Sequence, residues 1–134
     1  MCLDIDYSLT EKKKKSKKKV YYFWKAFDIS RFGKLITPHA DAIVDTKIVE
    51  EHNPTEFNDD QSIFPTEISD GALHASTSLL ANKLNLPLSY IRLRIKVNKE
   101  DIIAWGADKD VCFKKYEFTR LSVWRSKREG VILK

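Results

Sequence analysis

The chain has 134 residues, 43% hydrophobic and 32% charged, a composition typical of one globular domain. Its formal net charge is +5, but seven of its 24 basic residues form one run: Lys12, Lys13, Lys14, Lys15, Lys17, Lys18 and Lys19. The rest of the chain has 17 basic and 19 acidic residues, so the positive charge is not spread evenly over the domain. We therefore expect a lysine-rich leader over residues 1–19, as a short helix or disordered, and one domain over residues 20–134.

The targeting and cysteine signals favour a reduced, intracellular setting. No apolar stretch approaches the ~18 residues of a membrane-spanning helix, and the lysines do not precede an apolar core as in a secretory signal peptide. Cys2 and Cys112 are too few for a disulfide framework and lack metal-ligand spacing. We expect a cytoplasmic protein with no metal, no cofactor and no membrane partner.

The first half of the chain predicts a helix and then a hairpin. Ser8 and Glu11 have the spacing of a capping box, which predicts a short helix, although repulsion within the lysine run opposes it. The aromatic run over 20–27 predicts a strand buried on both faces. A turn over 28–33, with Gly33 at positive φ, leads to a return strand over 34–37.

The middle of the chain is polar and shows no clear helical or strand periodicity. Residues 42–44 and 47–49 are short strand candidates, and the stretch 50–60 reads as a long surface loop.

The second half predicts strands around one helix. A strand over 71–75 precedes a helix over 78–84, capped by Ser76 or Thr77. The stretch 90–97 alternates apolar and basic residues, as a strand with one buried face does, and strands over 102–106 and 111–123 follow. Because short turns join antiparallel neighbours, the fold class expected is α+β: a curved, mainly antiparallel sheet of five to seven strands packed on one main helix.

Basic residues mark one candidate surface for nucleic acid or another anionic partner. It comprises the lysine run and, if they lie beside it, Arg92, Arg94 and Lys96. Lysines alone give salt-dependent, non-specific affinity, so an ordinary solvated tail is the competing interpretation. Aromatic residues at 21–24, 105 and 124 could stack bases, or belong to the core and its rim.

Two further candidates concern catalysis or anion binding. If Met1 is removed, Cys2 gains a free α-amine that can activate its thiol, but Cys2 can equally anchor the leader as a small apolar residue. His74, Ser76 and Thr77 stand where a strand meets the expected helix N-terminus, a position that suits anions. A His74 hydrogen-bonded in place is the alternative. Neither feature forms a catalytic constellation, and Cys112 is expected to be packed in a strand.

The order of these segments resembles a family of small uncharacterised proteins of bacteria and phages. The matching pieces are Met1-Cys2-Leu3, the charged leader, Tyr22-Phe23-Trp24-Lys25-Ala26-Phe27, Gly71-Ala72-Leu73-His74-Ala75, Arg94-Ile95-Lys96-Val97, the stretch 100–106 and Val111-Cys112-Phe113-Lys114-Lys115. The resemblance implies the fold, a phage or mobile-element origin and a host-cytoplasmic location, but no activity. The strand with His74 before a helix is also similar to ADP-ribosyltransferase-like folds, which imply a glutamate or arginine partner, with Glu117 as one candidate.

These observations favour a non-enzymatic accessory protein that binds another macromolecule, with a protein as the first partner expected and nucleic acid as the second. The alternatives are a small ADP-ribosyltransferase-like enzyme or hydrolase at the His74 junction, and non-specific nucleic-acid binding through the leader.

Overall fold

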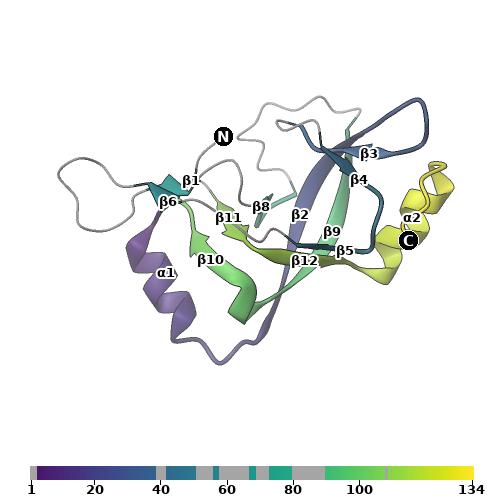
Figure 1. Cartoon of the computed structure of the whole chain (residues 1–134). Helices are drawn as coiled ribbons and strands as arrows, with labels where there is room; N and C mark the ends of the chain where they lie inside the picture. Colours follow the sequence, from purple (N-terminus) through teal and green to yellow (C-terminus); the bar gives the residue numbers. More distant parts are fainter. Residues whose placement is uncertain are drawn as a thin grey trace.

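In the computed structural model, a curved antiparallel sheet lies between two helices, one from each end of the chain (Figure 1). The structure describes residues 3–38, 42–50, 56–57, 67–68, 73–79, 90–107 and 109–134. The helices are α1 (Tyr7–Lys14), α2 (Arg120–Arg128) and the short 3-10 helix η1 (Lys99–Asp101). The strands are β1 (Leu3–Asp4), β2 (Val20–Ile29), β3 (Leu35–Ile36), β4 (Ile43–Val44), β5 (Ile48–Glu50), β6 (Glu56–Phe57), β7 (Glu67–Ile68), β8 (Leu73–Ser76), β9 (Ile91–Asn98), β10 (Ile102–Trp105), β11 (Asp110–Phe113) and β12 (Lys115–Phe118).

The main sheet has the strand order β10-β11-β8-β2-β9-β12-β5, and β3 and β4 continue it from the end of β2. All of its described pairings are antiparallel. A second, three-stranded sheet has the order β1-β7-β6. The predicted α+β class with a curved antiparallel sheet is confirmed. No helix in the described ranges is long and apolar enough to cross a membrane.

The long β2–β9 ladder forms the centre of the main sheet. Its register runs from Val20 opposite Asn98 to Phe27 opposite Ile91. Along β9 the apolar residues are buried and the basic ones are not, as the alternation predicts. The prediction that β2 is buried on both faces is wrong, because its burial also alternates and leaves Tyr22 46% exposed.

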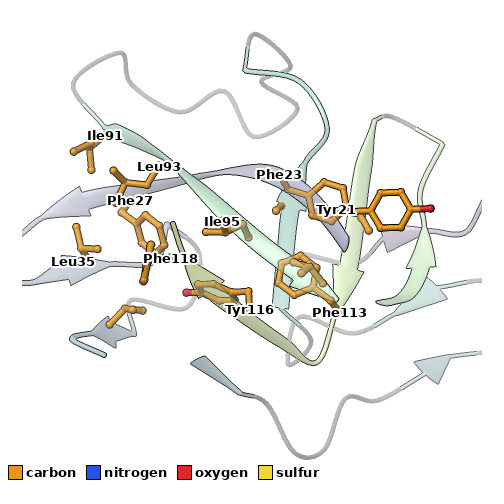
Figure 2. Close-up of a cluster of buried hydrophobic side chains, with 14 of the residues drawn as sticks. Tyr21, Phe23, Phe27, Leu35, Ile91, Leu93, Ile95, Phe113, Tyr116 and Phe118 are labelled. Carbon is orange, nitrogen blue, oxygen red and sulfur yellow. The ribbon is translucent and has the colours of Figure 1, made fainter. Parts of the chain in front are cut away.

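The core lies on one side of the main sheet and is rich in aromatic rings (Figure 2). Phe23 stacks with Tyr21 and with Phe113, at ring-centroid distances of 6.2 and 6.1 Å. Trp105 meets Tyr21 and Phe23 edge-on, at 5.2 and 5.4 Å. Since such offset and edge-to-face contacts add to the gain from burying each ring, they bind β2, β10 and β11 to one another.

A hairpin turn follows β2 and brings the chain back along it. Gly33 has φ of +75°, as predicted, and its N–H donates to the Ser30 carbonyl oxygen at 3.0 Å. The return strand β3 then pairs with the end of β2, Ile29 lying opposite Leu35.

The strand predicted over 111–123 is wrong. The chain forms β11 and β12 and then turns into α2, because the Thr119 side chain accepts a hydrogen bond from the Ser122 N–H at 3.3 Å and caps the helix. α2 is the main helix of the fold. Most of the helix predicted over 78–84 lies outside the described residues, and the described residues 77–79 form a bend.

The helix predicted in the leader is present, but its cap is not the one predicted. Asp6 rather than Ser8 is the N-cap, and its carboxylate accepts from the Leu9 N–H at 2.9 Å. Asp6 precedes the first turn and so meets the free amides, whereas Ser8 already lies within the helix. Leu9 packs against the main core, so α1 lies on the body of the protein.

Candidate functional site

The outer side of the central ladder carries alternating aromatic and basic side chains. On β2 these are Tyr22 and Trp24, and directly opposite on β9 are Lys96 and Arg94. Arg92 follows on the same side of β9, opposite Ala26. We call these five residues, Tyr22, Trp24, Arg92, Arg94 and Lys96, the β2–β9 face.

Arg94 holds the centre of the β2–β9 face. Its guanidinium carbon lies 4.8 Å from the centroid of the Trp24 ring and 5.9 Å from that of Tyr22. A guanidinium over an indole is a favourable cation–π contact, which keeps both side chains in a defined position. Tyr22 is well exposed and Trp24 is half-buried, so their rings remain accessible beside the cation.

The main chain of β9 beneath this face is fixed by α2. The Arg94 carbonyl oxygen accepts from the Ser122 hydroxyl at 2.8 Å, and the Arg92 carbonyl oxygen accepts from the Arg125 guanidinium at 3.0 Å. The described pairing of β9 with β12 ends where Phe118 lies opposite Ile95. Beyond this point, α2 provides the hydrogen-bond donors for the Arg94 and Arg92 carbonyl oxygens. The backbone that carries Arg92 and Arg94 is therefore hydrogen-bonded to α2 as well as to β2.

The lysine run does not extend away from the molecule but folds around two core aromatics. The Lys13 ammonium lies 4.8 Å from the centroid of the Trp105 ring, and the Lys18 ammonium lies 4.9 Å from that of Tyr21. Lys99 donates to the Ser16 carbonyl oxygen at 2.5 Å, which ties the segment after α1 to η1. The run is thereby gathered at one end of the β2–β9 ladder.

A pocket of about 670 Å³ opens between α1 and this end of the ladder. Four lysines and one glutamate line it together with aromatic and aliphatic side chains; the lining is Thr10, Lys13, Lys14, Lys19, Val20, Tyr21, Asn98, Lys99, Glu100, Ile102, Ile103 and Trp105. Sequence analysis missed this pocket, since its lining comes from three separate stretches. The only signal in the sequence was the lysine run itself.

The predicted anion site at His74, Ser76 and Thr77 is described only in part. The Ser76 and Thr77 hydroxyls lie 3.3 and 3.1 Å from the Lys109 carbonyl oxygen, so they contact an acceptor. His74 is half-buried on β8, opposite Cys112. The helix expected to follow lies outside the described residues, as does Cys2, so both site hypotheses stay predictions.

The His74 backbone has a partner that the sequence did not indicate. The Lys25 ammonium donates to the His74 carbonyl oxygen at 2.6 Å and lies 5.9 Å from the centroid of the Tyr116 ring. Burial lowers the pKa of Lys25 to about 8, because the charged ammonium loses its hydration. Burial also raises the pKa of Tyr116 above its ordinary value.

Neither Cys112 nor any cluster of potential metal ligands adds a further site in the described part of the chain. Cys112 is fully buried beside Ala104 in a small second cluster, as predicted. Among the described residues there is no group of three or more histidine, cysteine, aspartate or glutamate side chains placed to hold a metal ion.

Comparison of the chain with protein-family models, with curated proteins and with solved structures gave no match. The resemblance to small bacterial and phage proteins therefore stays a prediction.

Proposed function

We propose that this protein binds single-stranded nucleic acid, with the β2–β9 face as the contact surface. The observation that carries the proposal is the Arg94–Trp24 pair, a cation held 4.8 Å from a partly exposed indole at the centre of a sheet. Aromatic rings on a sheet offer a stacking surface for bases, and adjacent arginines and lysines attract the phosphates between them.

The charge around the exposed rings favours nucleic acid over the protein partner that the sequence suggested first. The β2–β9 face carries three cations beside its two aromatics, and Glu117 lies opposite Lys96 on the neighbouring strand. Tyrosine, tryptophan and arginine are common at the centres of protein interfaces too, so the rings alone do not distinguish the two partners. The argument for nucleic acid is the excess of cations, three against one paired acid, since a single-strand groove combines rings with cations. We therefore place the lysine run in a supporting role, as the source of longer-range attraction.

The proposed binding is tested by fluorescence anisotropy with a short labelled single strand of mixed sequence. Removing the stacking ring in Trp24→Ala should weaken binding between about fivefold and 100-fold, since stacking contributes roughly 1–3 kcal/mol per base. Arg94→Ala should weaken binding and lower the slope of log affinity against log salt by about one ion. A duplex of the same sequence should bind more weakly, because its bases are already stacked.

Two matched variants control for loss of a ring and loss of a charge. Trp124 is also exposed and lies beside an arginine, Arg128, at 5.0 Å, but it stands on α2 outside the β2–β9 face. Arg31 lies in the hairpin turn beyond the end of β2, and that end, at Ile29, is about 17 Å along the strand from Trp24. Trp124→Ala and Arg31→Ala should keep near-wild-type affinity. Equal losses in Trp24→Ala and Trp124→Ala, or none in either, would contradict the proposal.

A further inference from the structure

We propose that the pocket between α1 and β10 binds the phosphate of a nucleotide unit, free or at the end of a strand. The strand-end case rests on the proposed function, whereas binding of a free nucleotide does not. The pocket volume of about 670 Å³ lies within the range of small-molecule sites and exceeds what a phosphate alone would fill.

The charge of the lining selects an anion. Four of the pocket residues are lysines and one, Glu100, is acidic. Two of the lysines are held in place, because the Lys13 ammonium lies over the Trp105 ring and Lys99 is bonded to the Ser16 carbonyl oxygen. Ammonium groups that line one pocket repel one another, and a doubly charged phosphate offsets that repulsion.

A buried hydroxyl in the pocket wall provides a second, independent observation. Tyr21 lines the pocket and is only 5% exposed, and its hydroxyl has no hydrogen-bond partner within the described ranges. Figure 2 shows this hydroxyl pointing away from the other labelled rings of the core. A buried donor without an acceptor is unfavourable, and a phosphate oxygen in the pocket is a strong acceptor.

The apolar part of the lining explains why the ligand is a nucleotide rather than a bare anion. Val20, Ile102 and Ile103 line the same pocket as the lysines. A ligand that is anionic at one end and flat and apolar at the other contacts both kinds of wall. A single carboxylate offers two acceptor oxygens and one charge to the four ammoniums, whereas a terminal phosphate offers three oxygens and two charges.

The pocket lies at the end of the ladder that carries the β2–β9 face. Val20 and Asn98 are paired in the ladder and line the pocket, and Tyr22 and Lys96 are the next pair on the same side of the sheet. Two residues along a strand span about 7 Å. Tyr21 points to the opposite side of β2 from Tyr22, so the terminal phosphate of a strand stacked on Tyr22 would reach the pocket lysines around this end of the ladder.

The decisive variant is Tyr21→Phe, which removes the hydroxyl and keeps the ring. In calorimetric titrations with AMP, it should weaken binding roughly fivefold to tenfold while the thermal midpoint stays the same or rises. Tyr116→Phe is the matched control, since the Tyr116 hydroxyl is also buried without a partner in the described part of the chain but does not line the pocket. It should leave AMP affinity unchanged.

A charge variant gives an independent reading. Lys19 is an exposed pocket lysine, so Lys19→Gln should weaken AMP binding without affecting the fold. Lys47→Gln, an exposed lysine outside the pocket, should not. Equal loss in both variants would show general charge attraction and would overturn the proposal.

The source of the nucleotide is separated with one oligonucleotide carrying either a 5′-phosphate or a 5′-hydroxyl. Tighter binding of the phosphorylated form, lost in Tyr21→Phe but not in Tyr116→Phe, supports the strand end. AMP binding without that difference supports a free nucleotide. Failure of AMP to bind, together with equal affinity for both oligonucleotides, overturns the inference. The proposed function fails separately, when Trp24→Ala leaves oligonucleotide affinity unchanged.

Discussion

The Thr10 hydroxyl and the Trp105 backbone are joined by two hydrogen bonds across 95 residues of sequence. The hydroxyl accepts from the Trp105 N–H at 3.1 Å and donates to the Trp105 carbonyl oxygen at 3.3 Å. Both residues are buried and both line the pocket. Together with the Asp6 N–H, which donates to the same carbonyl at 2.9 Å, this contact holds α1 and its lysines beside β10.

Thr10→Val should destabilise the protein by about 1–3 kcal/mol, because it leaves the buried Trp105 N–H without its acceptor while keeping the side-chain shape. The Trp105 carbonyl still accepts from the Asp6 N–H, so the loss concerns chiefly the donor. Chemical denaturation measures the change. Ser8→Ala, at an exposed position on the same helix, should lie at or slightly above wild type, since alanine is the better helix former. A comparable loss there would show that α1 is sensitive to the loss of any hydroxyl and not to the Thr10 contact in particular.

Gly33→Ala should destabilise more than Gly130→Ala, although both glycines have positive φ, +75° and +82°. A Cβ at Gly33 would lie 2.7 Å from the Gly130 carbonyl oxygen, whereas a Cβ at Gly130 has nothing within 4 Å. The backbone strain of about 1 kcal/mol is common to both variants. The additional destabilisation of Gly33→Ala therefore measures the clash of its Cβ with the Gly130 carbonyl oxygen. Equal thermal midpoints for the two variants would contradict this close approach of the hairpin turn to the end of α2.

The free energy of unfolding should rise between about pH 8 and pH 10 because of Lys25. Its pKa is lowered to about 8 in the folded protein, so in this window the unfolded chain holds a proton that the folded one has released. Stability then rises with pH, by roughly 1 kcal/mol per pH unit. Above this window, the raised pKa of Tyr116 acts in the opposite direction, since the unfolded tyrosine ionises first.

Lys25→Met should remove this rise, as denaturation curves at a series of pH values would show. Lys47→Met, at an exposed turn position, should keep it. A rise of the same slope in the Lys25 variant would assign the effect to another group.

Thr119→Ala should cost about 1 kcal/mol of stability, the usual contribution of a helix N-cap, and Thr119→Ser should restore most of it. The Thr119 hydroxyl also lies 3.3 Å from the Arg94 carbonyl oxygen, beneath the β2–β9 face. We therefore expect Thr119→Ala to weaken oligonucleotide binding slightly as well. Unchanged stability in Thr119→Ala would show that the Thr119 cap is not the reason why the chain turns from β12 into α2.

Local patterns in the sequence were sufficient for some elements. The alternation along β9 identifies both of its faces, because a strand turns successive side chains to opposite sides. Gly33 marks the hairpin turn because few other residues adopt its φ. The strand prediction was wrong over 119–123, since Leu121 and Val123 suit a strand as well as a helix and the Thr119 cap decides between them.

The candidate sites depended far more on contacts between distant segments. The sequence shows aromatic residues at 21–24 but not which of them face outward, because that follows from the register of β2 with β9. It shows seven lysines but not that Lys13 and Lys18 fold back over Trp105 and Tyr21.

By itself, then, the sequence determined the fold class, the turn at Gly33 and the separation of charge into one basic run, all of which depend on neighbours within a few residues. The tertiary structure alone decided that β2 is open on one side, that the lysine run lines a pocket, and that Tyr21 faces it. The physical reason is that each of these depends on long-range packing and pairing, such as the contact of Thr10 with Trp105, which no local pattern encodes.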